Sequence, residues 1–196
     1  MTDYFEGDPR SMRERMQAGE MYIADDAELA ADSRRAISLA DRYTRLWPQD
    51  PDTAVALLAE LLGEIGEGTE IRPPLYVDYG KYISIGARTF INYNFTALDV
   101  APISIGDDVQ IGPNVQLLTP THPLAPGPRR DKLEAARPIT IGNNVWLGGG
   151  VVVLPGISIG ANTVVGAGAV VTRDLPANVV AVGNPARIVR ELDDGA

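Results

Sequence analysis

Branched aliphatic residues recur at every sixth position over a long stretch of this chain. One row runs through Ile141, Leu147, Val153, Ile159, Val165 and Val171. A second row, four positions further along, runs through Val145, Val151, Ile157, Thr163 and Ala169. The period matches neither an α-helix nor an ordinary strand. It is typical of a parallel β-helix, in which three short strands make one coil and the aliphatic side chains point to the axis.

The same register extends towards the N-terminus. It includes Ile85, Ile91, Ile105, Ile111 and Leu117, with Val109 and Val115 in the second row. Glycine or another residue that favours turns follows most of these aliphatic residues, and such residues allow the tight corners that a coil needs. The pattern therefore predicts a mainly β solenoid that occupies most of the chain.

The repeat is interrupted between residues 118 and 138. This segment contains Pro120, Pro123, Pro126, Pro128 and Pro138, and we expect no regular structure in it. Because both flanks keep the same register, we interpret the segment as an excursion loop from a rigid coil. Long loops in compact domains are often functional. His122, the only histidine of the chain, lies near the start of the loop.

The N-terminal third has the pattern of helices. Ser11 and Glu14 match a capping box, and Asp25 or Asp26 is expected to cap a second helix that ends at Pro48. A third helix is predicted from Asp50 and Pro51, over residues 55–62. Solenoids need a cover over their apolar ends. We therefore divide the chain into a helical cap that also contributes to an acceptor site (1–66), a β-helix domain (67–190) and a tail (191–196).

Composition excludes several classes of protein. The chain has no cysteine, so thiolate nucleophiles, disulfides and cysteine-based metal sites are excluded, and a single histidine makes an imidazole-based metal site implausible. Serine-hydrolase and phosphate-loop motifs are absent. A net charge of −9 disfavours binding to nucleic acid and to anionic membranes. Without a long apolar segment or a secretory signal pattern, we expect a cytoplasmic protein.

These exclusions leave one prominent candidate for chemistry. An imidazole on a proline-flanked loop can act as a general base near neutral pH. The alternative is a surface or structural histidine. The residues by themselves leave both interpretations of His122 open.

Several segments together resemble the hexapeptide-repeat O-acetyltransferases, and in particular the maltose and galactoside O-acetyltransferase group. They are the hexads, Thr121-His122-Pro123, Asn143-Asn144-Val145-Trp146, Gly183-Asn184-Pro185-Ala186-Arg187, residues 16–22, Asp78-Tyr79-Gly80 and Asn92-Tyr93-Asn94. The resemblance covers roughly residues 11–190. It implies a left-handed parallel β-helix, a homotrimer with active sites between subunits, acetyl-CoA as co-substrate and a sugar acceptor, with no metal.

The resemblance also implies roles for residues that touch the acceptor or the reacting atoms. His122 matches the general base, Gly149 matches a backbone N–H that stabilises the oxyanion, and Glu134 is expected to orient His122 or to stabilise its imidazolium. Asn92 matches a residue that binds the acceptor hydroxyl, as does Asp26, with Asp25 as the other candidate. Each position also has a structural interpretation: a loop charge at Glu134, a corner residue at Asn92 or Gly149, and a helix cap at Asp26.

Coenzyme A is expected to lie against a second set of residues. The positions that match are Trp146 on the pantetheine arm, Gly149 and Ala167 through the backbone, and Thr172, Arg173, Arg187 and Arg190 near the nucleotide and its phosphates. At position 173 arginine replaces the lysine of the family, which keeps the charge but changes the geometry. The structural alternatives are a subunit contact for Trp146 and ordinary terminal arginines.

The resulting hypothesis is an acetyl-CoA-dependent O-acetyltransferase that modifies a sugar hydroxyl of the maltose or glucose type. Direct transfer in a ternary complex is expected, with His122 as the base. One alternative is a relative with another acceptor: a xenobiotic, a lipo-oligosaccharide or an amino acid hydroxyl. Another is a scaffold protein without catalysis, and a metal hydratase on the same fold is a weaker third.

Overall fold

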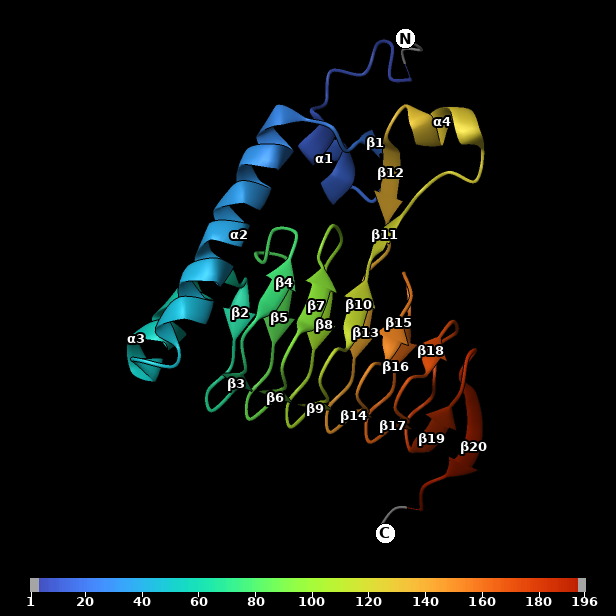
Figure 1. The fold of residues 1–196 in the computed structure, drawn as a ribbon. Helices are drawn as coiled ribbons and strands as arrows, with labels where there is room; N and C mark the ends of the chain where they lie inside the picture. Colours follow the sequence, from blue (N-terminus) through green and yellow to red (C-terminus); the bar gives the residue numbers. More distant parts are fainter. Residues whose placement is uncertain (1–3, 194–196) are drawn as a thin grey trace.

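The computed structural model describes residues 4–193 and shows a parallel β-helix built from three sheets (Figure 1). Sheet 1 contains β4 (Leu75–Val77), β7 (Phe95–Leu98), β10 (Gln116–Leu118), β15 (Val152–Val153) and β18 (Val170–Val171). Sheet 2 contains β2 (Glu64–Ile65), β5 (Ile83–Ile85), β8 (Ile103–Ile105), β13 (Ile139–Ile141) and β16 (Ser158–Ile159). Sheet 3 contains β3 (Glu70–Ile71), β6 (Phe90–Ile91), β9 (Gln110–Ile111), β14 (Trp146–Leu147), β17 (Val164–Val165), β19 (Val179–Val182) and β20 (Arg187–Glu191).

The six-residue repeat produces aligned ladders of buried aliphatic side chains. In sheet 2, Ile85 pairs with Ile105, which pairs with Ile141, and Ile141 pairs with Ile159. All four are buried, as the sequence predicts. Buried threonines stand at the second-row position in two hexads, Thr89 and Thr163, and they are tolerated because their hydroxyls donate to the carbonyl oxygens of Gly106 and Pro176. The periodicity thus predicts both the core and its register.

Two of the three corners between sheets matter for function. The loop edge is the corner where the chain passes from sheet 1 to sheet 2, and it contains residues 78–82, 99–102, 119–138, 154–157 and 172–174. The glycine edge is the corner from sheet 3 to sheet 1, and it contains residues 72–74, 92–94, 112–115, 148–151 and 166–169. Sheet 1 lies between these two edges.

Helices cover the N-terminal end of the solenoid. They are α1 (Met12–Gln17), α2 (Ala27–Leu46) and α3 (Pro51–Leu61), and their N-caps are Ser11, Asp26 and Asp50. The capping box at Ser11 is confirmed. Tyr43 of α2 is buried in the same core as Leu58 of α3 and the first strands, and its hydroxyl donates to the carbonyl oxygen of Ile71. The helical segment therefore does cap the solenoid.

The expectation that the excursion loop lacks regular structure is wrong. The segment contains β11 (Pro120–Thr121), α4 (Pro126–Arg130) and β12 (Leu133–Ala136). Proline is compatible with α4 because Pro126 stands in its first turn, where an amide hydrogen is not needed. Strand β12 pairs antiparallel with β11 and also with β1 (Tyr22–Ile23) from the N-terminal segment. Figure 1 shows this small sheet standing above the solenoid, between α1 and α4.

Candidate active site

An open pocket of about 380 Å³ lies at the loop edge, between the N-terminal segment, the solenoid and the excursion loop. Its polar lining includes His122, Glu134, Asp78, Tyr22 and Tyr79. The remaining lining residues are Ala24, Leu29, Ala30, Ser33, Leu98, Val100 and Pro120. A separate apolar cluster, which contains Met16, Leu29, Val100 and Ala136, lies under this pocket and joins the same three segments.

The His122 ring is held from both of its nitrogen atoms. Nδ1 lies 3.3 Å from the carbonyl oxygen of Leu133, and Nε2 lies 3.4 Å from Oε2 of Glu134. A carbonyl oxygen and a carboxylate both only accept, so the Leu133 contact favours a hydrogen on Nδ1, and the Glu134 contact favours a proton on Nε2 when the ring takes up a second one. The His122 side chain is 52% exposed and Glu134 only 13%. The ring is therefore accessible to a reactant while the carboxylate behind it is largely shielded.

Two carboxyl groups lie close together at this pocket: Asp78, which lines it and is partly buried, and Asp99, which is not part of its lining. Asp99 is fully buried and accepts the backbone N–H groups of Asp78 (3.0 Å), Tyr79 (2.8 Å) and Tyr82 (3.2 Å). Burial raises the pKa of Asp99. Burial also raises the pKa of Asp78 to about 7, and the negative charges of Asp99 and Glu134 add to the effect. Asp78 therefore changes charge near neutral pH.

The raised pKa of Asp78 predicts a pH-dependent stability. The folded protein binds this proton more tightly than the unfolded chain, so the contribution of Asp78 to stability is present at acidic pH and is lost as the pH rises to about 7. We expect Asp78→Asn to raise Tm at pH 8 by at least about 2–4 °C, the shift that about 1 kcal/mol produces, and to have little effect at pH 4.

Thermal unfolding at both pH values checks this prediction. Asp25→Asn is the matched control, because Asp25 is exposed and should respond equally at both. An equal response of Asp78→Asn at pH 4 and pH 8 would contradict the assignment.

The glycine edge brings together a different set of predicted residues. Gly149 and Ala167 occupy the same turn position in successive coils, and a Cβ on Gly148 would lie 2.6 Å from the nitrogen of Ala167. Neither amide has a protein acceptor among the described residues. Trp146 precedes this corner on the outside of sheet 3, with 56% of its surface exposed. The edge thus presents unpaired amide donors beside an exposed indole.

The remaining predicted residues are distributed over both edges. Asn92 lies on the glycine edge, where its side chain accepts the backbone N–H of Tyr93 at 2.8 Å. Thr172 and Arg173 are exposed on the loop edge, and Arg187 and Arg190 are exposed on β20.

The two aspartates proposed as acceptor contacts do not line the pocket. The Asp26 carboxylate accepts the amides of Glu28 and Leu29 at the start of α2, and Asp25 is exposed. In this structure Asp26 is thus a helix cap, the alternative that the sequence offered.

Within one chain, therefore, the candidate base and the candidate oxyanion donor lie on different edges. His122 and Glu134 belong to the loop edge, while Gly149, Ala167 and Asn92 belong to the glycine edge, with sheet 1 between them. The sequence did not single out Tyr22, Asp78 or Asp99 as site residues. The six-residue period carries no signal for them, because they lie outside the aliphatic rows.

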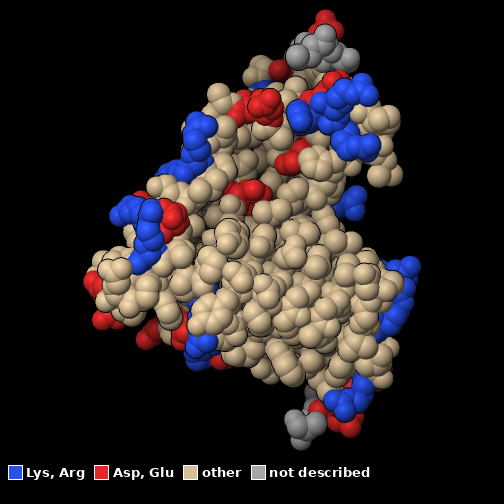
Figure 2. Space-filling view, in the orientation of Figure 1, with Lys and Arg blue, Asp and Glu red and all other residues tan. Residues whose placement is uncertain are grey.

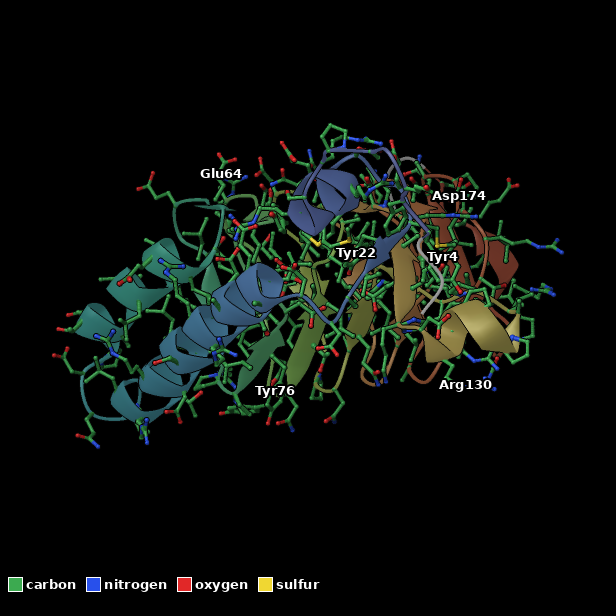
Figure 3. The ribbon with its side chains drawn as sticks, turned by 90° about the horizontal axis from the view of Figure 1, so that it is seen from above. Tyr4, Tyr22, Glu64, Tyr76, Arg130 and Asp174 are labelled. Carbon is green, nitrogen blue, oxygen red and sulfur yellow. The ribbon has the colours of Figure 1, made fainter. Side chains whose placement is uncertain are left out.

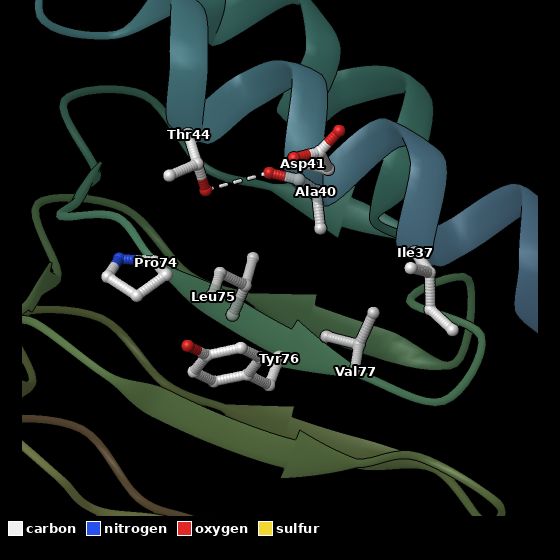
Figure 4. A pocket seen from close by; sticks show the side chains of 8 residues that line it. All are labelled: Ile37, Ala40, Asp41, Thr44, Pro74, Leu75, Tyr76 and Val77. Carbon is white, nitrogen blue, oxygen red and sulfur yellow. Dashed lines mark hydrogen bonds between the residues drawn. The ribbon is translucent and has the colours of Figure 1, made fainter.

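A larger cavity, of about 430 Å³, lies between α2 and β4 (Figure 4). Its walls are mostly apolar and include Ile37, Leu75, Tyr76 and Val77. Thr44 bonds back to the carbonyl oxygen of Ala40 on its own helix. The cavity has no histidine and no carboxylate pair, so we place the chemistry at the smaller pocket.

Two kinds of feature are absent from residues 4–193. No group of three or more His, Cys, Asp or Glu side chains is arranged to hold a metal ion in this part of the chain. None of the helices described for it is both long and apolar enough to cross a membrane.

Comparison with known families agrees with the architecture. The profile of the maltose acetyltransferase hexapeptide capping motif matches residues 15–66, and that of the bacterial transferase hexapeptide, with six repeats, matches residues 138–173. Nodulation protein L of Rhizobium meliloti is 47% identical over 91% of this chain and 98% of its own length. The galactoside O-acetyltransferase of Escherichia coli is 39% identical, over 93% of this chain and 90% of its own.

Solved structures show the same relationship. A maltose O-acetyltransferase from Clostridium difficile superposes with a TM-score of 0.92, at 38% identity, over 94% of this chain and 99% of that one. A galactoside acetyltransferase in complex with coenzyme A superposes with a TM-score of 0.90, at 39% identity, over 94% of this chain and 92% of that one.

The solenoid, its helical cap and these matches define a hexapeptide-repeat acyltransferase with the left-handed β-helix that the resemblance implied. Within this class, the chain belongs to the maltose and galactoside O-acetyltransferase family, whose acetyl donor is acetyl-CoA. Both expectations from the sequence, the fold and the family, are confirmed.

Proposed function

We propose that this protein transfers acetyl from acetyl-CoA to a hydroxyl of a sugar of the maltose or glucose type, with His122 as the general base. The observation that carries the proposal is the half-exposed imidazole, fixed between Leu133 and Glu134, in a pocket of about 380 Å³. That volume falls in the range of small-molecule sites. Glu134 supports an acceptor of the maltose type, because the resemblance places glutamate there in those enzymes.

The proposed mechanism uses Nε2 of the His122 ring as the proton acceptor. Nε2 removes the proton from the acceptor hydroxyl as its oxygen attacks the thioester carbonyl carbon, and the resulting imidazolium faces Oε2 of Glu134. The C–S bond then breaks, and the coenzyme A sulfur leaves with the proton that His122 held. No covalent enzyme intermediate is needed, so both substrates are bound together and their positioning supplies much of the rate.

The oxyanion of this reaction needs a donor, and the Gly149 amide is a suitable one. Its N–H has no acceptor among the described residues, and backbone amides are rigid, preorganised donors. Because Gly149 and His122 lie on different edges of one chain, we propose that each active site joins the loop edge of one protomer to the glycine edge of the next. Asn92, on the same edge as Gly149, would then contact the acceptor from the neighbouring protomer.

A homotrimer provides such a pairing of edges, and the surface supports self-association. The outward positions of sheet 1 carry no charge: they are Tyr76, Thr96, Leu98, Gln116, Leu118, Val152 and Val170. Figure 2 shows a surface without charged side chains over the centre of the solenoid, with Lys, Arg, Asp and Glu around its margins. A large uncharged face of this kind is typical of a subunit interface.

The exposed indole gives a prediction about the donor. If Trp146 packs on the pantetheine arm, Trp146→Ala should raise the KM for acetyl-CoA about tenfold and leave kcat within a few-fold, because an apolar contact of about 1.4 kcal/mol is lost. The matched control is Gln110→Ala, one coil earlier in the same register. Steady-state kinetics with varied acetyl-CoA decide the point. An unchanged KM in Trp146→Ala would assign the indole to a subunit contact instead.

A thiol-release assay tests the proposed function directly. Acetyl-CoA is incubated with the protein and a panel containing maltose, glucose and galactosides, with serine and chloramphenicol as controls for other acceptor classes. We expect release of coenzyme A with at least one sugar. Turnover with only a control acceptor would support the relative with another acceptor, and the absence of turnover with every sugar would contradict the proposed acceptor class.

A further inference from the structure

The N-terminal segment reaches into the candidate active site at one residue. Tyr22 in β1 stands directly opposite Glu134 in β12, in an antiparallel pair of strands that joins residues 112 positions apart. Directly opposite residues in such a pair point to the same face and contact each other. Figure 3 shows Tyr22 at this junction, between the N-terminal segment and the excursion loop.

The contact is a hydrogen bond with a defined direction. The Tyr22 hydroxyl donates to Oε1 of Glu134, while Oε2 of the same carboxylate faces His122 at 3.4 Å. Tyr22 is 1% exposed, and burial, followed by the hydrogen bond to Glu134, raises its pKa, so the hydroxyl stays protonated and remains a donor. The two oxygens of Glu134 are therefore used by two different partners.

Few other groups can hold the Glu134 carboxylate in place. Apart from His122, no donor other than Tyr22 reaches its carboxylate among the described residues. Asp78, in the same pocket, carries a charge of the same sign when it is ionised. A flexible carboxylate side chain in this setting needs a fixed partner to stay beside the imidazole, and a buried phenol on a paired strand is rigid.

We infer that Tyr22 is a positioning residue that holds the Glu134 carboxylate beside His122. The inference rests on the proposed role of His122 as the base. It gives the N-terminal segment a second role beyond capping the solenoid: its β1 strand fixes the geometry of the catalytic loop. The alternative is that the Tyr22 hydroxyl only satisfies a buried polar contact.

Kinetics of three variants separate these roles. Tyr22→Phe removes one oxygen atom, and we expect kcat to fall about tenfold with an unchanged KM for acetyl-CoA, the loss that about 1.4 kcal/mol produces. In a Glu134→Ala background, Tyr22→Phe should lower kcat by less than about twofold, because the carboxylate that Tyr22 positions is gone. Tyr43→Phe is the matched control, since Tyr43 is equally buried and donates to a backbone carbonyl remote from the site. It should lower Tm without lowering kcat.

A second readout does not depend on turnover. Because His122 is the only histidine, protein labelled with 15N-histidine gives the ring signals of this one residue. Tyr22→Phe and Glu134→Ala should shift these signals in the same direction, and Tyr43→Phe should leave them in place. If no acceptor supports turnover, the proposed function fails, but this comparison still decides the inference. Unchanged ring signals in Tyr22→Phe, or an equal kinetic cost with and without Glu134, would overturn it.

Discussion

His122→Ala should lower kcat by about 10²–10⁴-fold, the contribution of a positioned general base to the attack of a weakly nucleophilic hydroxyl. Binding of acetyl-CoA, measured by calorimetry, should change little, because the unpaired amides and the exposed indole lie on the other edge. Folding should also be preserved, since the side chain is half-exposed and lies on the excursion loop.

Two controls make this result specific. Added imidazole should restore part of the activity of His122→Ala, because the vacated pocket opens to solvent. Glu134→Gln should lower kcat less than His122→Ala does, since it removes a charge near the ring but leaves the imidazole in place. A kcat of His122→Ala within a few-fold of the wild-type value would exclude the proposed base.

Gly149→Pro should lower kcat by about 10²–10³-fold, because proline has no N–H and the oxyanion would lose its donor. The turn itself should accept the substitution. One coil earlier, Pro113 stands at the same position, preceded by Gly112 and followed by Asn114 at φ 60°, as Gly149 is followed by Gly150 at φ 71°. The substitution therefore removes a donor with little change in the backbone.

Gly149→Ala is the matched control for this variant. It keeps the amide, and its Cβ would approach the carbonyl oxygen of Pro113 no closer than 3.3 Å. Activity should stay within a few-fold of wild type, and circular dichroism and Tm should show both variants folded. If Gly149→Pro and Gly149→Ala lost activity equally, the cause would be crowding at the corner, and the amide would have no role.

The sequence predicted the solenoid because its signal is local and repeated. Each aliphatic residue from Ile141 to Val171 has the same environment one coil away, so a period of six specifies the register. The structure of the excursion loop was not predictable in this way. Strand β12 forms by pairing with Tyr22 and Ile23, which are far away in the chain, and no short-range sequence pattern predicts such a partner.

The candidate site was predictable only in part, for a related reason. The single histidine stood out by composition, and the resemblance supplied Glu134, Gly149 and Trp146. The sequence left two roles open for Asp26, an acceptor contact and a helix cap. The structure was needed to show that its carboxylate caps α2. Burial raises the pKa of both Asp78 and Asp99, and the charges of Asp99 and Glu134 raise that of Asp78 further. This burial depends on segments from different parts of the chain that meet around one pocket.

The proposed mechanism requires active sites that two protomers share, and mixing two inactive variants tests this most directly. His122→Ala and Gly149→Pro protomers, carrying different tags, are unfolded together at equal amounts, refolded and purified through both tags. In a trimer that carries both tags, one site in three combines a native His122 with a native Gly149 from the neighbour, so about a third of wild-type activity should return. Mixed oligomers that carry both tags and remain as inactive as their parents would contradict the shared site.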